Sequence, residues 1–340
     1  MRPDGADAMG TMRLIVVTGA GGYLGRACVA EARRQGLFVL ALHRSRPDPA
    51  WSGDARVQAL QGDLTDPEIH VALQELPNDT AFIHAAGHMG DDPKALALDT
   101  ISATAFLPIR QTQRLVLISS LAVYDTDRLS PGDTLNEASP LLPVPVDWEM
   151  APTETIRSAS SPYAMAKRLQ ETVHGPQAAL RACWVLRPGA IWGPGRSWHA
   201  LQGFWAGKLH VTIGSDGALP LAHLDNVAQA AVTAALRDSD GCEAINVFDD
   251  DCPTRARFLQ AHRAAYGWPR LNVTIPYTAW AAAIRPCRPF AHRLPGLFRE
   301  TTLRARMMPI RCPNTRLRQR LGGGQPGFET LLADARRAES

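Results

Sequence analysis

The sequence predicts an α/β protein built on a doubly wound parallel sheet, with a smaller lobe toward the C-terminus. Three observations predict this fold class. A glycine-rich turn, "VTGAGGYLG" at 17–25, follows an apolar run that begins at Leu14. Short continuous apolar runs then alternate with helical patterns, as expected for strands that are covered on both faces. After about residue 193 the alternation fades into segments that carry proline, arginine and tryptophan.

The expected elements follow in order along the chain. The first strand is expected over 13–19 and the helix after it over 23–36, where Gly36 closes the helix. Further runs with the length and apolar character of buried strands lie at 37–42, 56–62, 80–87, 114–120 and 183–192. Strands separated by helices in this way favour a Rossmann-type sheet. We therefore expect one domain over 12–192 and a smaller lobe over 193–335, some segments of which return to the first domain.

Composition points to small-molecule chemistry. Of the 340 residues, 45% are hydrophobic and 20% are charged, and the formal net charge is +3 at pH 7. This charge is too small to predict binding to nucleic acid, and no stretch is long and apolar enough for an integral membrane segment. Residues 1–11 lack the apolar core of a signal peptide and are expected to be a disordered leader or an artefact of the chosen start. We therefore expect a cytoplasmic protein.

The six cysteines are scattered, at 28, 183, 242, 252, 287 and 312, and form no C-x-x-C pair. This pattern favours reduced thiols over a disulfide framework or a zinc site. We accordingly expect no metal centre.

Three glycines stand between the first strand and the first helix. The start of a helix offers backbone N–H groups and the positive end of the helix dipole to a phosphate. Gly19 would permit the tight turn, Gly22 would let the backbone approach a pyrophosphate, and Gly25 would let the helix pack closely. The spacing is G-x-x-G-x-x-G rather than G-x-G-x-x-G, and a plain strand–helix turn is the alternative. The cofactor-binding residues expected here are Gly19, Gly22, Tyr23, Leu24 and Gly25.

The end of the second strand bears on the choice between NAD and NADP. Dinucleotide folds that bind NAD usually place a carboxylate there to hold the ribose 2′-hydroxyl. Here the segment reads "LALHRSRPD", with Arg44 and Arg46 and no carboxylate before Asp48. Two guanidinium groups could bind a 2′-phosphate, and the alternative is that one or both face solvent. The sequence therefore favours NADP over NAD.

The segment "SSPYAMAKRLQE" at 160–171 places Tyr163 and Lys167 four residues apart, on one face of an expected helix. A free tyrosine, with a pKa of about 10, is a poor base at neutral pH. A lysine ammonium one turn away would lower that pKa, although a value near 7 would also require the positive ring of a bound cofactor. Upstream, Ser119 and Ser120 follow a strand at its carboxyl end, where such folds bind ligands. A hydroxyl there could donate to a substrate oxygen beside Tyr163.

Seven segments, in this order, resemble those of the extended short-chain dehydrogenase/reductases, often called the NAD-dependent epimerase/dehydratase family. The resemblance covers roughly residues 12–325. The segments are "VTGAGGYLG" (17–25), "GDLTD" (62–66), "HAAG" (84–87), "LISSLAVYD" (117–125), "SPYAMAK" (161–167), "LRPGAIWGPG" (186–195) and "LAHLDNVAQA" (221–230).

The resemblance implies a role for each matching residue. Ser120 would orient a carbonyl, Tyr163 would pass a proton to or from the reacting oxygen, and Lys167 would hold the ribose and tune the tyrosine. Hydride would move to or from the nicotinamide, so the cofactor would carry out the redox step. The other implied cofactor contacts are Asp63 and Leu64 at the adenine, Ala85, Ala86 and Gly87 along the cofactor, and Pro188, Gly189 and Ile191 at the nicotinamide.

Departures from the family's motifs narrow the range of reactions that this chain is expected to catalyse. Sugar-nucleotide dehydratases of this kind usually carry an Asp-Glu pair just after the catalytic hydroxyl, where this chain has Leu121 and Ala122. Epimerases often have an asparagine after the sixth strand, where this chain reads "RPGAIWGPG". The family's usual asparagine before the fifth strand is missing from "ALALDTISAT" at 95–104, which argues against a water-mediated proton relay. Dehydration is therefore set aside, and the chain comes closer to the carbonyl reductases.

Several other polar and aromatic residues have structural interpretations. Asp225 is expected to cap a helix with His223 packed near it, and His84 at a strand end is expected to be structural. The segment 126–160 is expected to fold over the active site as a lid. Four residues after the sixth strand either line a substrate pocket or form an aromatic core cluster: Arg196, Trp198, His199 and Trp205.

We therefore expect an NADP-dependent oxidoreductase that acts on a small carbonyl or secondary alcohol, with a homodimer left open. One alternative is a nucleotide-sugar epimerase, which would oxidise and re-reduce one carbon while retaining NAD. Another is a non-catalytic sensor that binds NAD(P), although such a sensor needs none of Ser120, Tyr163 and Lys167.

Overall fold

The computed structural model describes residues 13–110, 113–174, 180–199, 201–214, 217–294 and 296–339. Within them the chain forms two compact units. The first contains the described parts of 13–118, 169–186 and 228–244, and the second contains those of 119–168, 187–227 and 245–339. The expected division of function between 12–192 and 193–335 stays a prediction.

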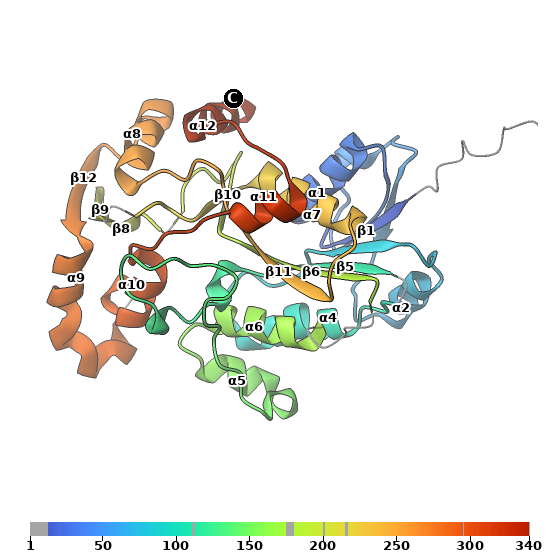
Figure 1. Cartoon of the computed structure of the whole chain (residues 1–340), viewed down its shortest axis with the longest axis horizontal. Coiled ribbons are helices and arrows are strands. Elements are labelled where there is room, and N and C mark those ends of the chain that lie inside the picture. The colour runs from blue at the N-terminus through green and yellow to red at the C-terminus, as the bar shows by residue number, and fades with distance from the viewer. Residues whose placement is uncertain are drawn as a thin grey trace, which may run out of the picture. The chain divides into compact units, whose positions relative to one another are not determined.

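A seven-stranded sheet forms the centre of the first unit, in the order β11-β6-β5-β4-β1-β2-β3 (Figure 1). The pairs from β6 across to β3 are all parallel. Because the chain starts in the middle of the sheet and builds outward in both directions, the predicted doubly wound α/β fold is confirmed. The strands are β1 Leu14–Thr18, β2 Phe38–His43, β3 Val57–Gln61, β4 Ala81–His84, β5 Arg114–Ile118, β6 Ala182–Pro188 and β11 Cys242–Val247.

Helices cover both faces of this sheet (Figure 1). Helices α1 and α7 lie on one face, and α2, α4 and α6 lie on the other. On the second face Ile69 and Leu73 of α2 pack with the strand residues Val16, Phe82 and Leu115 in one buried apolar cluster. The helices are α1 Tyr23–Arg34, α2 Pro67–Gln74, α3 Pro93–Leu96, α4 Ala103–Ala105, α6 Pro162–His174 and α7 Leu224–Leu236, with a π-helical turn, η2 Ala97–Ser102, before α4.

The first helix forms where the sequence predicts it. Cys28, Val29 and Ala32 are its buried side chains, which gives α1 an apolar stripe against the sheet. The helix ends before Gly36, whose φ of +79° is the left-handed conformation that closes many helices. This ending agrees with the predicted role of Gly36.

The run predicted as one strand over 183–192 is two strands, so this prediction is wrong in part. β6 ends at Pro188, and β7, Ala190–Trp192, pairs with β10, Leu221–His223, in a separate two-stranded sheet. Gly189 forms the break, because its N–H donates to Val247 O and a Cβ on it would lie 2.2 Å from Pro220 O. An apolar run cannot reveal such a change of partner, because both strands are buried and apolar.

The second unit also contains a three-stranded sheet, in the order β12-β9-β8. Two buried apolar clusters, one around Phe248 and Met307 and one around Trp192 and Phe258, form its core. Its other elements are β8 Gly203–Ala206, β9 Leu209–Gly214, β12 Leu271–Pro276, α5 Pro152–Ser158, α8 Arg255–Tyr266, α9 Tyr277–Ile284, α10 Glu300–Met307, α11 Thr315–Leu321 and α12 Phe328–Ala338. Short 3₁₀ turns occur in both units: η1 Pro49–Trp51, η3 Leu121–Val123, η4 Thr126–Arg128, η5 Trp148–Met150, η6 Arg285–Arg293 and η7 Gly296–Phe298. In the part of the chain that the structure describes, every helix is too short or too polar to cross a membrane.

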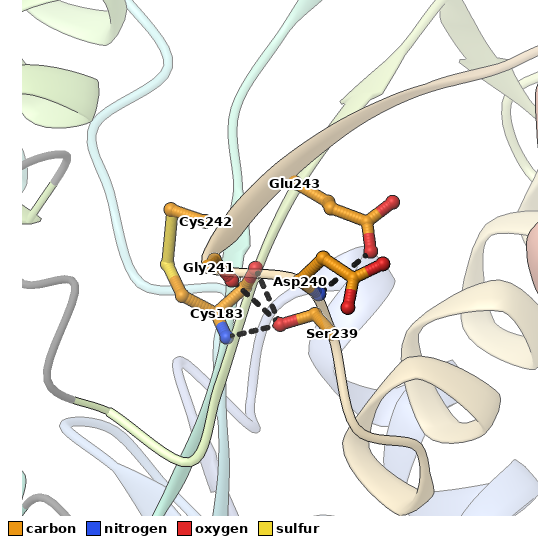
Figure 2. The surroundings of a disulfide bond; sticks show 6 residues. All are labelled: Cys183, Ser239, Asp240, Gly241, Cys242 and Glu243. Atoms are coloured by element: carbon orange, nitrogen blue, oxygen red, sulfur yellow. Dashed lines mark hydrogen bonds between the residues drawn. A yellow bond between two sulfur atoms is a disulfide. The ribbon is translucent and has the colours of Figure 1, made fainter.

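The cysteines correct a second prediction, that all six are reduced. Cys183 and Cys242 form a disulfide with their Cα atoms 4.4 Å apart (Figure 2). The two residues lie at the starts of β6 and β11, which are neighbours in the sheet although 59 residues separate them in sequence. Ser239 lies beside the bond, where its Oγ accepts from Cys183 N–H at 2.9 Å and donates to Gly241 O at 2.7 Å. The free cysteines are Cys28, Cys252, Cys287 and Cys312.

Candidate active site

A cavity of about 290 Å³ opens in the first unit where β1, β2, β3 and β4 end. In doubly wound sheets ligands bind outside the carboxyl ends of the strands. Most of the predicted cofactor residues of this unit meet here. The lining residues are Gly19, Gly21, Gly22, Leu42, His43, Arg44, Ser45, Gly62, Asp63, Leu64, Ala85, Ala86, Gly87, Asp99 and Ala103.

At two positions the glycine turn leaves no space for a side chain. Gly19 has a φ of +68°, and a Cβ on it would lie 2.7 Å from Ala86 N. A Cβ on Gly25 would lie 2.1 Å from Gly19 O, inside the turn itself. Gly22 is the N-cap of α1 and gives no side-chain cap, so the helix start is open to a ligand. Tyr23, Leu24 and Gly25 form the first turn of α1 and do not line the cavity.

Three charged side chains meet on the wall of the cavity. Arg44 Nη1 lies 2.9 Å from Asp99 Oδ1, and Nη2 lies 3.1 Å from Asp99 Oδ2. Asp63 Oδ2 is a weaker partner, at 3.5 Å from Arg44 Nη1. The hydrogen bond with Asp99 raises the pKa of Arg44. Arg46, which the sequence grouped with Arg44, is exposed and does not line the cavity.

Sequence reasoning missed Asp99. Asp99 lies in "ALALDTISAT", the segment from which the family's usual asparagine is missing. An acidic residue within this apolar stretch could have indicated a functional position. The π-helical turn η2 holds Asp99 in place, and such turns are frequent at functional sites.

A buried polar network includes the turn after β4. His84 Nδ1 lies 2.7 Å from Thr18 Oγ1, and His84 Nε2 lies 2.8 Å from Thr104 Oγ1. Since the Thr104 hydroxyl donates its only proton to Thr100 O, His84 Nε2 donates to Thr104 Oγ1. Thr18 Oγ1 in turn accepts from Ala86 N–H at 3.4 Å. The buried His84 side chain thus connects β1 to α4, and its structural role stays a prediction.

The second unit contains the three predicted catalytic residues. Ser120 is the N-cap of η3, where its Oγ accepts from Ala122 N–H at 3.2 Å. Ser120 also forms a hydrogen bond with the phenol of Tyr163, which lies in the first turn of α6. Lys167 is buried one turn further along the same helix. The structure thus brings Ser120 and Tyr163 into direct contact and places Lys167 on the adjacent turn.

The electrostatics of Tyr163 differ from the expectation. Burial raises the pKa of Tyr163, and the hydrogen bond with Ser120, which lowers it, does not offset this effect. The predicted net lowering by Lys167 is therefore absent in the chain alone. The phenol keeps its proton, which is the state needed to donate that proton to a substrate oxygen.

The residues predicted to border the nicotinamide lie around the β6–β7 break. Pro188 ends β6, Gly189 is the break, and Ile191 is in β7. Next to them is a network that sequence reasoning missed: buried Arg187 donates to Tyr124 Oη at 3.0 Å, and Tyr124 donates to Asn246 Oδ1 at 2.8 Å. These hydrogen bonds connect the segment after Ser120 to the end of β6.

The contacts bear on two further predictions, which concern the cap of α7 and the residues after the sixth strand. His223, and not Asp225, caps α7, because its Nδ1 accepts from Asp225 N–H at 3.3 Å while the Asp225 side chain is exposed. Of the residues after the sixth strand, Trp198 and Trp205 lie in an aromatic cluster, and a substrate pocket at this segment stays a prediction. Trp198 packs against Trp205, His210, Phe258, His262 and Trp268. Within the described ranges, no group of three or more His, Cys, Asp and Glu side chains is placed to hold a metal ion.

A glycine-rich turn between the first strand and the first helix of a doubly wound sheet is typical of enzymes that use a nucleotide cofactor, and this chain has such a turn. The model of the NAD dependent epimerase/dehydratase family matches residues 15–247. The chain therefore belongs to this family, the extended short-chain dehydrogenase/reductases, and the resemblance seen in its motifs is confirmed.

Three curated relatives of this chain are named reductases. A 3-diazoavenalumate denitrifying reductase of Streptomyces sp is 27% identical over 75% of this chain and 82% of its own length. A 2-alkyl-3-oxoalkanoate reductase of Stenotrophomonas maltophilia (strain K279a) is 28% identical over 77% of this chain and 78% of its own length. A protein of the same name from Shewanella oneidensis is 27% identical over 76% of this chain and 68% of its own length.

Solved structures with the same fold include an epimerase and the terminal domain of a biosynthetic pathway. UDP-glucuronic acid 4-epimerase from Bacillus cereus, in complex with UDP-glucuronic acid and NAD, is 16% identical, with a TM-score of 0.64 over 95% of this chain and 98% of that one. The terminal R domain from the myxalamid PKS-NRPS biosynthetic pathway is 17% identical, with a TM-score of 0.66 over 97% of this chain and 91% of that one. At these identities the likeness establishes the fold.

Proposed function

We propose that this chain is an NADP(H)-dependent oxidoreductase that interconverts a small carbonyl compound and its secondary alcohol, with Ser120, Tyr163 and Lys167 as catalytic residues. The observation that carries the proposal is the hydrogen bond between Ser120 and a half-buried Tyr163 whose pKa is raised, so that the phenol keeps its proton. A phenol in this state is a proton donor, which suits the reduction of a carbonyl. The reductase names of the curated relatives agree with this direction.

The proposed chemistry assigns one task to each side chain. When bound, the nicotinamide supplies a hydride to the carbonyl carbon. Tyr163 Oη gives its proton to the carbonyl oxygen as negative charge develops there, and solvent later returns a proton to the phenolate. Ser120 Oγ, which already accepts from Ala122 N–H, keeps its own proton to donate to the same oxygen. The ammonium of Lys167 favours the phenolate that forms after the transfer.

The residues of the first unit fit a dinucleotide. The cavity lies at an uncapped helix start, and a Cβ on Gly19 would meet Ala86 N at 2.7 Å, so the turn is shaped for close backbone approach. Gly19, Gly22 and Ala85 to Gly87 would hold the cofactor along its length, and Asp63 and Leu64 would flank the adenine. Arg44, directly after β2, supports NADP because that position meets the ribose 2′ group in this fold.

The cofactor proposal is tested by calorimetric titration with NADPH and NADH. A guanidinium–phosphate contact is worth roughly 1–3 kcal/mol, so NADPH should bind more tightly. Arg44→Gln should remove most of that preference. Arg46→Gln is the matched control, and since Arg46 is exposed and outside the cavity its effect should be smaller. Equal or tighter binding of NADH by the wild-type protein would contradict the choice of NADP.

The reaction is tested by following NADPH oxidation with a panel of ketones and 3-oxo acids. The 3-oxo acids come first because two relatives are named 2-alkyl-3-oxoalkanoate reductases. We expect net oxidation of NADPH that depends on the carbonyl substrate and is lost in Tyr163→Phe. Tightly retained NAD with no net redox change would instead indicate an epimerase, and binding without turnover would indicate a sensor. The cytoplasmic location, the homodimer and the lid over 126–160 stay predictions.

A further inference from the structure

The ion pair between Arg44 and Asp99 occupies the part of the cavity that should distinguish NADP from NAD. Arg44 follows β2 directly, where a dinucleotide fold meets the ribose 2′ group. Both terminal nitrogens of its guanidinium contact Asp99, at 2.9 and 3.1 Å. The Nη1/Nη2 edge of the guanidinium, one of the edges that could bind a 2′-phosphate, is therefore already held by a carboxylate of the chain itself.

The two carboxylates of this wall oppose the attraction of Arg44 for a phosphate. Asp63, Asp99 and Arg44 together carry two negative charges and one positive charge, and all three line the cavity. A 2′-phosphate would add close to two more negative charges at neutral pH, whereas a 2′-hydroxyl adds none. The Asp99 side chain is only 15% exposed, so solvent screens its charge incompletely. Among the described residues, His88 is a second basic group that faces this carboxylate, with its Nδ1 3.9 Å from Asp99 Oδ2.

We propose that Asp99 is a specificity-determining residue that restrains the preference for NADPH by competing with the 2′-phosphate for Arg44. The inference rests on the proposed binding of a nicotinamide dinucleotide in this cavity. Arg44 makes the site able to accept NADP, and Asp99 limits how strongly NADP is preferred over NAD. The choice of cofactor thus depends on two residues that lie 55 positions apart in sequence.

The test measures the dissociation constants of NADPH and NADH by calorimetric titration of the whole protein and of Asp99→Asn. The amide keeps the size of the side chain and one oxygen acceptor but removes the charge and one acceptor. We expect the ratio of the two constants to move at least ~10-fold toward NADPH, while NADH affinity changes by less than ~3-fold. Asp99→Ser, which removes both oxygens, should shift the ratio in the same direction and serves if the asparagine variant folds poorly.

Two controls separate this role from a general effect of charge. Asp54→Asn removes a carboxylate that pairs with Arg33 at 2.7 Å in the same unit but does not line the cavity, and it should leave the ratio unchanged. Arg44→Gln combined with Asp99→Asn should abolish the gain, because Asp99 acts through Arg44.

The failures of the two proposals are distinguishable. An unchanged ratio in Asp99→Asn, or an equal shift in Asp54→Asn, would overturn the role of Asp99 and leave the dinucleotide proposal standing. A wild-type protein that binds neither dinucleotide would overturn both.

Discussion

The glycine-lined cavity and the Ser120–Tyr163 pair are built in different ways. The charged wall of the cavity is partly open, since the Arg44 side chain is 60% exposed, and the three charged residues of the wall come from three separate segments of the chain. Tyr163 and Lys167 lie four residues apart on one helix, where Lys167 is only 7% exposed. Exposed charges are screened by solvent and individually weak, whereas polar groups that are shielded from solvent interact more strongly. Single substitutions should therefore have large effects on the catalytic step. Their effects on the preference between NADPH and NADH should be smaller.

The sharpest test of this contrast is Tyr163→Phe. It should lower turnover at least ~100-fold, the scale of lost general acid–base catalysis, because the phenol is the assigned proton donor. Cofactor affinity should hardly change. Steady-state kinetics on an established carbonyl substrate and titration of the cofactor measure the two effects.

Lys167→Ala is the companion variant, and it should harm both turnover and cofactor binding because Lys167 is expected to touch the ribose as well as to tune the tyrosine. Near-native turnover in the phenylalanine variant would show that another group donates the proton.

A second test concerns the disulfide of the first unit. Removing a native disulfide by Cys242→Ser should lower the free energy of unfolding by roughly 2–4 kcal/mol, because the bond restrains the unfolded chain. Chemical denaturation without reductant measures the change. Cys287→Ser is the control, because Cys287 is free. A thiol count of six in the denatured, unreduced protein would show that the bond does not form.

A third test addresses the glycine turn. Gly25→Ala would place a Cβ 2.1 Å from Gly19 O, a backbone atom that cannot move aside cheaply. We expect a loss of about 1–3 kcal/mol in stability, with weaker cofactor binding because the turn itself is displaced. Gly21→Ala is the matched control: its Cβ would make an ordinary contact, 3.6 Å from His43 Cβ. Equal losses in both variants would mean that the close fit at Gly25 is not what matters.

The sequence predicted what depends on local pattern. The strands from Leu14 to Ile118, the helix closed by Gly36 and the spacing of Tyr163 and Lys167 all follow from periodicity and from residues close together in the chain. Contacts between distant segments could not be predicted in this way. The disulfide depends on β6 and β11 being neighbours, and the ion pair of Arg44 depends on a π-helical turn 55 residues away. The rise in the pKa of Tyr163 depends on burial, which the helix pattern alone does not give.

The smallest expected effect is the binding of nucleoside diphosphates. An epimerase must hold a nucleotide diphosphate firmly while the sugar turns over, which needs fixed donors near the sixth strand. This chain has Pro188, Gly189 and Ala190 there, without a side-chain amide. The backbone donors are also occupied, because Gly189 N–H bonds to Val247 O at 3.1 Å and Ala190 N–H bonds to Pro220 O at 2.8 Å.

UDP and GDP should therefore bind with dissociation constants near or above ~1 mM, which corresponds to no more than about 4 kcal/mol. Thermal-shift titration of the NADP-bound protein measures this, since a ligand far below its dissociation constant does not stabilise the fold. The Bacillus cereus epimerase, solved with UDP-glucuronic acid and NAD, is the positive control. Clear stabilisation of this chain by micromolar UDP or GDP would favour the epimerase over the reductase, because it would reveal diphosphate donors other than those of the β6–β7 break.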